Sequence, residues 1–309
     1  MNRAHHQQLA LRRMAGFATA DEPLGPHTTY RVGGPALIFA TPRTLHDLEV
    51  IGEVVRETGL PLLTIGRGSN LLVADAGFEG IVVSVSALGE WIEFDGATVA
   101  AGGAVALPVL ARRCVAAGLV GFEWAVGVPG SVGGAVRMNA GGHGSDMAAS
   151  LVGVHVFDLQ ITEQVWLPVE ALGLRFRSSD LADHQVIVDA RLQLSFGDVA
   201  AAEATLSEIV RWRREHQPGG QNAGSVFVNP LPGELPAAVL IDRLGLRGFR
   251  IGGAFVSEKH ANFIQASDGA TAADVHAVMQ HVRAAVQESS GYCLRSEVRL
   301  VGFAPEGVE

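Results

Sequence analysis

The chain has 309 residues, of which 48% are hydrophobic and 18% are charged, so a large apolar core is expected and intrinsic disorder is not. Its 23 Lys and Arg residues stand against 32 Asp and Glu residues, which gives a formal net charge of −9. An acidic chain without a basic block is a poor partner for nucleic acid or an anionic membrane, and we expect neither. The length suits two or three domains.

The two cysteines, Cys114 and Cys293, give no sign of redox or metal chemistry. Neither lies in a C-x-x-C pair, and no Cys/His cluster has zinc spacing, so we expect unreactive thiols in a reducing compartment and no metal. The N-terminal segment lacks the apolar core of a signal peptide, and no stretch approaches the ~20 apolar residues of a membrane span. We therefore expect a cytoplasmic protein. We expect the first 15 or so residues to be disordered and assign them no role.

Hydrophobic periodicity predicts a small α/β unit at the N-terminal end of the chain. Its predicted elements are a strand at 36–40, a helix from Leu45 that Thr44 caps and Gly59 ends, a strand at 62–65, a loop at 66–70 and an extended segment at 71–74.

A different pattern begins at residue 81 and predicts a second unit with a mixed sheet. Short strands are expected at 81–85, 91–94 and 98–101, a helix at 109–117, a Gly-rich stretch without regular periodicity at 127–144, and strands at 152–159, 161–167 and 186–196. A third unit is predicted from helices at 200–216, 235–244 and 272–287, the last capped by Thr271, and a final strand at 293–302. The fold class is α+β.

Two glycine-rich segments are candidates for holding phosphate groups. The loop Gly66 to Asn70 follows a strand, and glycines let backbone amides approach a phosphate closely. It lacks the third glycine of a Rossmann fingerprint and leads into an extended segment rather than a helix, so a plain turn is an equal alternative.

The second segment, Gly127 to Gly144, is either a flexible surface loop or a backbone that passes close to a dinucleotide. Its interleaved Val, Ala and Met residues favour a packed segment. Two such loops in one chain fit the two phosphates of a flavin dinucleotide.

Three further segments carry polar side chains with possible chemistry. Arg175 and Arg177 alternate on a segment predicted to be extended, which would place them on one face as carboxylate partners or as solvated surface residues. Ser225 follows a glycine and is either a proton donor, a nucleophile or a turn serine. Phe227 rules out a G-x-S-x-G elbow.

Polar residues in 252–263 either line a site or cap a helix. Glu297 is predicted to share a strand face with Arg295 and Arg299, opposite the apolar face, which is also the pattern of an edge strand facing water.

The order of these segments resembles the UDP-N-acetylenolpyruvoylglucosamine reductase family. Matching segments lie at 28–36, 66–73, 127–144, 176–179, 224–230, 252–263 and 297–302. The resemblance implies an α+β fold with a two-part FAD-binding region of the vanillyl-alcohol-oxidase type and a C-terminal α/β substrate domain. It places the first FAD-binding subdomain at 1–80, with a strand at 292–309 returning to it, the second at 81–197, and the substrate-binding domain at 198–291.

The resemblance also implies the reaction. Members use NADPH and FAD to reduce UDP-N-acetylglucosamine enolpyruvate to UDP-N-acetylmuramate in peptidoglycan precursor synthesis. Arg177, Ser225 and Glu297 fall at the family's catalytic positions. Arg177 would stabilise the negative charge that develops on the substrate carboxylate, Glu297 would act as an acid with a raised pKa, and Ser225 would protonate the adjacent carbon.

The resemblance assigns binding residues as well. The FAD-binding residues are Gly66, Arg67, Gly68, Ser69, Asn70, Leu71, Gly127, Val128, Pro129, Gly130, Ser131, Gly133, Gly134, Asn139, Gly141 and Gly144. The substrate-binding residues are Asn229, Lys259, His260 and Asn262. We expect the protein to act as a monomer.

The chain departs from the family pattern at three positions: Phe176 stands in place of Tyr, Val228 in place of Lys, and His143 in place of Tyr or Phe. The short stretch between 170 and 200 indicates the shorter subgroup. Two alternatives remain, a related flavin oxidase or dehydrogenase of the same superfamily and a flavin- or nucleotide-binding protein without catalysis. A pure binding protein would need none of Arg177, Ser225 and Glu297.

Overall fold

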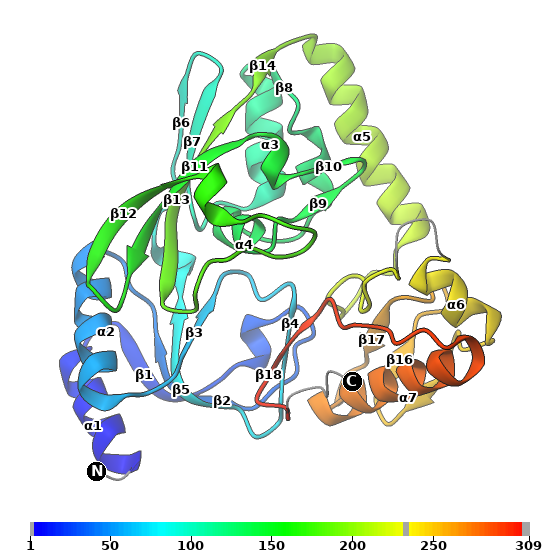
Figure 1. Ribbon diagram of the computed structural model, residues 1–309, viewed down its shortest axis with the longest axis horizontal. Helices are drawn as coiled ribbons and strands as arrows, with labels where there is room; N and C mark the ends of the chain where they lie inside the picture. The colour runs from blue at the N-terminus through cyan, green and yellow to red at the C-terminus, as the bar shows by residue number, and fades with distance from the viewer. Residues whose placement is uncertain (1–2, 231–234, 305–309) are drawn as a thin grey trace. The chain divides into compact units, whose positions relative to one another are not determined.

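The computed structural model describes residues 3–230 and 235–304 and divides the chain into two compact units (Figure 1). Unit 1 comprises Met1–Glu22, Leu37–Arg67 and Glu79–Arg213, and unit 2 comprises Pro23–Ala36, Gly68–Phe78 and Arg214–Glu309. The end of the predicted segment 292–309 lies outside the described residues.

The first part of unit 1 forms around a four-stranded sheet. Its elements are α1 (Arg3–Arg13), β1 (Ala18–Pro23), β2 (Pro35–Ala40), α2 (Leu45–Thr58), β3 (Leu62–Ile65) and β5 (Phe78–Ser84), and the strand order is β1-β2-β5-β3 with β3 and β5 parallel. Thr44 accepts from the Asp47 amide as the N-cap of α2, and Gly59 ends the helix at φ +66°, as predicted.

The N-terminal residues are helical, so the expectation of disorder is wrong for 3–13. Helix α1 buries Ala10 and packs against α2, where Arg13 pairs with Glu53 and Glu57. These contacts join residues 40 and 44 positions apart in the sequence, which a local pattern does not reveal.

The second part of unit 1 forms around a five-stranded antiparallel sheet. The strands are β6 (Ile92–Asp95), β7 (Thr98–Gly102), β11 (Leu151–Asp158), β12 (Glu163–Pro168) and β13 (Gln185–Gln193), in the order β12-β11-β13-β7-β6. The other elements are α3 (Leu107–Ala116), η3 (Glu123–Gly127), α4 (Val132–Arg137), α5 (Val199–His216), β8 (Leu119–Val120) paired with β14 (Ser195–Phe196), and β9 (Gly141–Gly142) paired with β10 (Ser145–Asp146).

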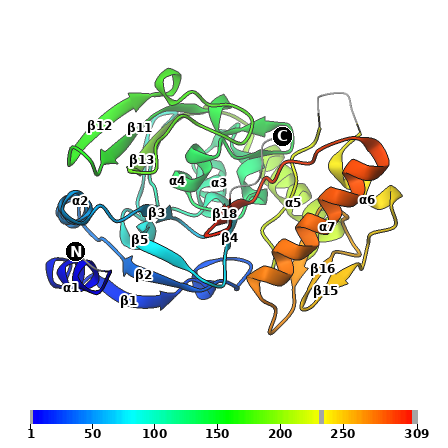
Figure 2. The ribbon, with the colours of Figure 1, turned by 60° about the horizontal axis from the view of Figure 1, so that its bottom comes forward.

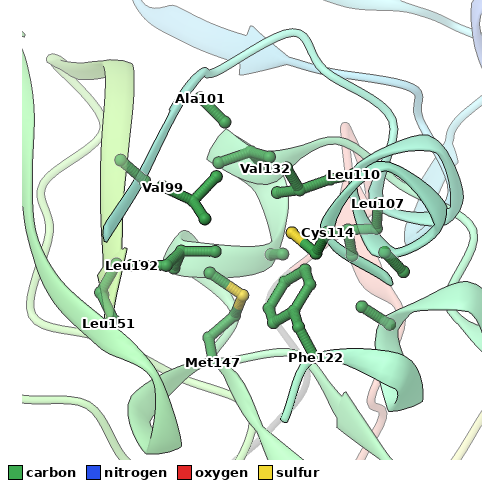
Figure 3. Close-up of a cluster of buried hydrophobic side chains, with 14 of the residues drawn as sticks. Val99, Ala101, Leu107, Leu110, Cys114, Phe122, Val132, Met147, Leu151 and Leu192 are labelled. Atoms are coloured by element: carbon green, nitrogen blue, oxygen red, sulfur yellow. The ribbon is translucent and has the colours of Figure 1, made fainter. Parts of the chain in front are cut away.

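Two separate apolar clusters fill unit 1. Figure 3 shows part of the larger one, where Cys114, Phe122, Met147 and Leu192 point toward one another. Three buried residues of α5, Ala202, Leu206 and Ile209, belong to the same cluster. Most of α5 therefore packs within unit 1, although the predicted third domain begins at 198.

The described residues of unit 2 form two short sheets and two α-helices. Strands β15 (Arg250–Ile251), β16 (Ala254–Val256) and β17 (Ile264–Ala266) pair antiparallel, and α7 (Ala272–Ser290) packs on them beside α6 (Ala237–Arg243) (Figure 2). Thr271 caps α7 with a capping box, as predicted. Strand β4 (Leu71–Val73) pairs in parallel with β18 (Arg299–Val301), so the predicted strand at 293–302 is observed only over its last third.

Within the described ranges, no helix combines the length and the apolar character that a membrane crossing requires.

Candidate functional site

Arg177 lies in a tight turn rather than on the extended segment that the sequence predicts. The Arg175 amide donates to the Ser178 carbonyl at 2.9 Å, and the Ser178 amide donates to the Arg175 carbonyl at 3.1 Å. Arg177 has φ +56°, a left-handed conformation that is unfavourable for a residue with a Cβ and recurs at functional sites. The expectation of one shared arginine face is wrong, because Arg175 pairs with Asp180 at 2.5 Å while the Arg177 guanidinium donates to the Gly141 carbonyl at 2.8 Å.

The turn lines an open pocket of about 400 Å³ in unit 1. The hairpin β9–β10 also lines it, with His143 (φ +52°) and Gly144 (φ +85°) as its two turn residues. Two-residue hairpin turns favour such left-handed conformations. Phe176 is 66% exposed, and its ring centre lies 5.0 Å from the Arg177 guanidinium carbon. The pocket thus brings the predicted catalytic arginine beside the predicted FAD residues Gly141 and Gly144.

Asn139 ties this hairpin to the turn that carries Arg177. Its side chain is buried, and Nδ2 donates to Asp146 Oδ2 at 3.1 Å and to the Arg175 carbonyl at 3.3 Å. Its Oδ1 accepts from the Ala148 amide at 3.0 Å. The predicted FAD residue Asn139 therefore uses its amide to hold the backbone around Arg177.

The two glycine-rich segments meet at Gly66. A Cβ on Gly66 would lie 2.4 Å from Ser131 Oγ, which is closer than Cβ contacts in real proteins. Ser131 is the N-cap of α4, where its Oγ accepts from the Gly134 amide at 3.4 Å, and the Gly133 amide donates to the Gly103 carbonyl at 2.9 Å. The start of the first predicted phosphate loop, at Gly66, therefore lies against the second loop within unit 1.

The start of the second glycine-rich segment is packed and regular rather than a flexible loop. Gly127 is buried at the end of η3, where a Cβ would lie 2.9 Å from the Ile209 side chain of α5. Val128, Pro129 and Gly130 then lead into α4, and the Gly130 carbonyl accepts from the amide of Leu107 at 3.0 Å. The sequence gives little sign of α4 because glycines make up a third of it.

The first loop passes from unit 1, which holds Gly66 and Arg67, into unit 2. Gly68 has φ +59°, and a Cβ there would lie 2.1 Å from the His27 carbonyl oxygen, so only glycine fits. Ser69 is half-buried, and Leu71 begins β4. Asn70 Nδ2 donates to the Glu297 carbonyl at 3.0 Å.

The structure brings the segments that carry Ser225 and Glu297 together in unit 2. The Glu297 amide donates to the Val226 carbonyl at 2.8 Å, and Phe227 forms an isolated antiparallel bridge with Ser296. Both predicted catalytic side chains are half-buried. Glu297 precedes β18, so the predicted placement on a strand face is wrong.

Asn262 lies on the other side of the segment that follows Ser225. Its side chain is 4% exposed. Its Oδ1 accepts from the Phe227 amide at 3.0 Å, and its Nδ2 donates to the Phe227 carbonyl at 2.8 Å. The Val226 amide donates to the Asn262 carbonyl at 2.9 Å.

The other predicted substrate residues also lie in unit 2. Asn229 is exposed, and its Oδ1 accepts from the Ala237 amide at the first residue of α6 at 3.0 Å. Lys259 is exposed, and its ammonium donates to the Arg214 carbonyl. Burial, and then the positive charge of Arg247, lower the pKa of His260.

Buried polar atoms beside the glycine-rich loops test whether a dinucleotide fits. Thr64 Oγ1, two residues before Gly66, and Trp124 Nε1, in η3, are buried without a hydrogen-bond partner in the described part of the chain. The same holds for Thr29 Oγ1, whose amide donates to the Gly68 carbonyl at 3.2 Å. Buried polar groups are nearly always satisfied, so a polar ligand at these loops fits the site. Sequence patterns gave no sign of these three side chains.

Two comparisons with families cover most of the chain. Residues 216–301 match the model of the UDP-N-acetylenolpyruvoylglucosamine reductase C-terminal domain, and residues 36–162 match the model of an FAD binding domain. The reductase of that name from Heliobacterium modesticaldum is 44% identical over 91% of this chain and 90% of its own length. The chain belongs to the UDP-N-acetylenolpyruvoylglucosamine reductase family. The expected family is therefore confirmed.

Other members of the reductase family are also similar to this chain over most of its length. The Bacillus subtilis reductase is 39% identical over 94% of this chain and 96% of its own length. The solved reductase from Thermus caldophilus is 34% identical, with a TM-score of 0.77 over 92% of this chain and 98% of that one. The matched FAD binding domain confirms the expected cofactor, FAD.

The expected fold class is confirmed too. A glucose dehydrogenase, Phl p 4.0202, shares the fold at 14% identity, with a TM-score of 0.50 over 72% of this chain and 52% of that one. With the FAD binding domain and the reductase structure, this likeness supports an α+β fold with an FAD-binding region of the vanillyl-alcohol-oxidase type.

His143, one of the departures from the reductase family pattern, still makes an aromatic contact. Its ring packs edge-on to Trp212 of α5, with ring centres 5.2 Å apart. Burial, and then the charge of Arg213, lower the pKa of His143, so its ring is neutral at neutral pH.

Proposed function

We propose that this chain catalyses the NADPH-dependent reduction of UDP-N-acetylglucosamine enolpyruvate to UDP-N-acetylmuramate through FAD, in peptidoglycan precursor synthesis. The observation that carries the proposal is the 44% identity with the Heliobacterium modesticaldum reductase over 91% of this chain. Such similarity over nearly the whole length includes both the FAD-binding part and the C-terminal part.

Two glycine-rich loops hold FAD in this proposal. The first loop contributes Gly66 to Leu71, and the second contributes Gly127 to Ser131, Gly133, Gly134, Asn139, Gly141 and Gly144. The clash that any Cβ would make at Gly66 or Gly68 supports a tight backbone at the first loop. FAD bound there would supply the redox chemistry, the transfer of a hydride from NADPH to the enolpyruvyl double bond.

Arg177 stabilises the negative charge that develops on the substrate carboxylate. Its guanidinium lines the pocket beside Gly141 and Gly144, which supports a place next to the cofactor. The hydrogen bond to the Gly141 carbonyl holds the guanidinium before substrate arrives, so little reorganisation is needed as charge develops. The Phe176 ring lies beside this guanidinium.

Ser225 donates a proton to the substrate carbon next to the one that accepts the hydride, and Glu297 assists from the adjoining segment. The hydrogen bond from the Glu297 amide to the carbonyl of Val226, the residue after Ser225, supports a joint role. A serine hydroxyl is a weak acid, so its alignment with a strongly basic carbon decides whether it can act. Glu297 contributes as a neutral acid or by orienting a donor.

Asn229, Lys259 and His260 contact the substrate in this proposal. The substrate contact expected of Asn262 is not proposed, because its side chain is buried and both of its polar atoms bond the Phe227 backbone. Lys259 brings a cation on an exposed side chain, which suits an anionic substrate in a chain of net charge −9. Val228, where the family usually has Lys, removes one positive charge beside Asn229.

We also propose that the protein acts in the cytoplasm as a monomer. Its two cysteines, Cys114 and Cys293, are both free thiols, which fits a reducing compartment. Size-exclusion chromatography with light scattering measures the oligomeric state directly, and a dimer mass would overturn the monomer.

Anaerobic stopped-flow spectroscopy tests the reaction. The holoenzyme is reduced with NADPH and then mixed with UDP-N-acetylglucosamine enolpyruvate while the visible absorbance of oxidised flavin is followed. We expect rapid reoxidation, and we expect Ser225→Ala and Glu297→Gln to slow it by roughly 10²-fold or more, the usual contribution of a general acid.

Ser290→Ala is the matched control, because Ser290 also lies in unit 2 but bonds the Val286 carbonyl inside α7. It should reoxidise like the wild type. Reduced flavin that ignores this substrate and reoxidises only with oxygen would identify a different flavoenzyme.

A further inference from the structure

The backbone beside Ser225 is held by a single buried side chain. Asn262 bonds both the amide and the carbonyl of Phe227, at 3.0 and 2.8 Å, and accepts from the Val226 amide through its own carbonyl at 2.9 Å. Only one orientation of the amide group satisfies this pattern, with Oδ1 on the N–H and Nδ2 on the carbonyl. The side chain thus acts as a neighbouring strand would for one residue.

Asn262 is itself fixed from its own side. Its amide donates to His260 Nδ1 at 3.3 Å, and the Ser257 amide donates to the Phe263 carbonyl at 2.8 Å, which closes the loop between β16 and β17. With 4% exposure, the Asn262 side chain has almost no surface left for a ligand. Its influence on a reaction must therefore pass through the backbone that it holds.

The opposite edge of the same backbone carries the link to Glu297. The Val226 carbonyl accepts from the Glu297 amide at 2.8 Å, and the Val228 amide donates to the Arg295 carbonyl at 3.0 Å. Residues 226–228 are thus fastened on one edge by Asn262 and on the other by 295–297. These hydrogen bonds on both edges set the position of the backbone that carries Ser225 relative to Glu297.

We propose that Asn262 is a positioning residue for Ser225, acting through the Phe227 backbone and not by contact with the substrate. The inference rests on the proposed function, in which Ser225 delivers a proton only after substrate binds. A displaced donor loses most of its effect, since misplacement by about 1 Å is worth about 10²-fold in rate. The two side-chain bonds from Asn262 to the Phe227 backbone form a clamp. Removing this clamp should slow the proton-dependent half of the reaction and leave flavin reduction by NADPH intact.

The test compares Asn262→Leu, which keeps the volume and loses both side-chain bonds, with Ser267→Ala as a matched control. Ser267 follows β17 in the same unit and loses one bond, from its Oγ to the Gly253 carbonyl at 2.7 Å. For Asn262→Leu holoenzyme we expect flavin reoxidation by UDP-N-acetylglucosamine enolpyruvate to slow roughly 10- to 100-fold, with the rate of flavin reduction by NADPH within about twofold of the wild type. Ser267→Ala should leave both rates unchanged.

A double variant separates positioning from general damage. If Asn262 acts through Ser225, adding Asn262→Leu to Ser225→Ala should slow reoxidation by less than about twofold beyond Ser225→Ala alone, because residues that act as a unit are non-additive. A further 10-fold loss in the double variant, or an equal loss in both half-reactions, would overturn the proposal.

Amide hydrogen exchange gives a result that does not depend on the reaction. The Phe227 amide should exchange at least 10-fold faster in Asn262→Leu than in the wild type and remain protected in Ser267→Ala. Unchanged protection at Phe227 would refute the clamp whatever the kinetics. The exchange difference could also be present while the reduced wild-type enzyme is not reoxidised by the substrate. The proposed function would then be wrong, and the clamp would hold the backbone without a catalytic role. That result would also overturn the positioning of Ser225.

Discussion

Replacing Gly66 by Ala tests the close approach between the two glycine-rich loops. The new Cβ would lie 2.4 Å from Ser131 Oγ but 3.6 Å from Ser131 Cβ, which is an ordinary contact. The conflict is therefore with the hydroxyl alone. Ser131 is 2% exposed and its Oγ caps α4 by accepting from the Gly134 amide, so the hydroxyl has little room to rotate away and loses the cap if it does.

The magnitudes follow from these contacts. Gly66→Ala should lower the free energy of unfolding by about 2 kcal/mol, within the usual range for overpacking. Ser131→Ala should cost about 1 kcal/mol through the lost N-cap. The double variant should cost only about 1 kcal/mol, because the hydroxyl that conflicts with the new Cβ is gone. The two changes are therefore sub-additive by about 2 kcal/mol.

Urea unfolding followed by tryptophan fluorescence measures the free energy of unfolding of unit 1, where both substitutions lie. All four tryptophans, Trp91, Trp124, Trp166 and Trp212, lie in unit 1, as do Gly66 and Ser131. Gly142→Ala is the control in the same unit, because a Cβ there meets only Val128 Cγ2, at an ordinary distance of 3.9 Å, and it should change stability by less than about 0.5 kcal/mol. A double variant that loses the sum of the two single costs would refute the contact.

Three further outcomes are expected. Burial raises the pKa of Cys114 to about 12, so iodoacetamide should label the exposed Cys293 in the native protein and reach Cys114 only after unfolding, as peptide mass spectrometry can show. Thr44→Ala removes the capping box of α2 and should cost about 1 kcal/mol in the same fluorescence assay without changing turnover. Hydrogen bonds from the amides of Thr271 and Gly253 lower the pKa of Asp274. Its stabilising effect is present above the ordinary carboxyl pKa near ~4 and is lost as pH falls through the lower folded value. The melting temperature of Asp274→Asn should therefore fall less than that of the wild type between about pH 4 and pH 2.

Elements with local signals were predictable from the sequence. The helix that begins after Thr44 and ends at Gly59 and the one that follows Thr271 carry caps within a few residues of their ends, and the structure confirms them. Capping is set by neighbouring residues, so a single sequence contains the information.

Features that depend on distant partners were not predictable in this way. The alternation between 293 and 302 suggested a long strand, but β18 extends only as far as its pairing with β4 allows. The turn at Arg177 has no local sign, because arginine rarely adopts a positive φ. The clamp on Phe227 joins residues 35 positions apart in the sequence, and an asparagine in a loop can form many other kinds of hydrogen bond. The catalytic positions proposed here come from the resemblance to a family, because local patterns did not single them out.

The pairing of β4 with β18 has a consequence for how the protein is made. Asn70 and Glu297, joined by one hydrogen bond beside these strands, lie 227 positions apart in the sequence. Chains are synthesised from the N-terminus at about 5–20 residues per second, so Asn70 leaves the ribosome at least ~10 seconds before Glu297 is added. The parts of unit 1 are complete once Arg213 has emerged, whereas unit 2 must keep β4 unpaired until the last strand arrives. Nascent chains stalled between these points would hold a folded flavin-binding segment and an open strand edge, the species on which chaperones and proteases act.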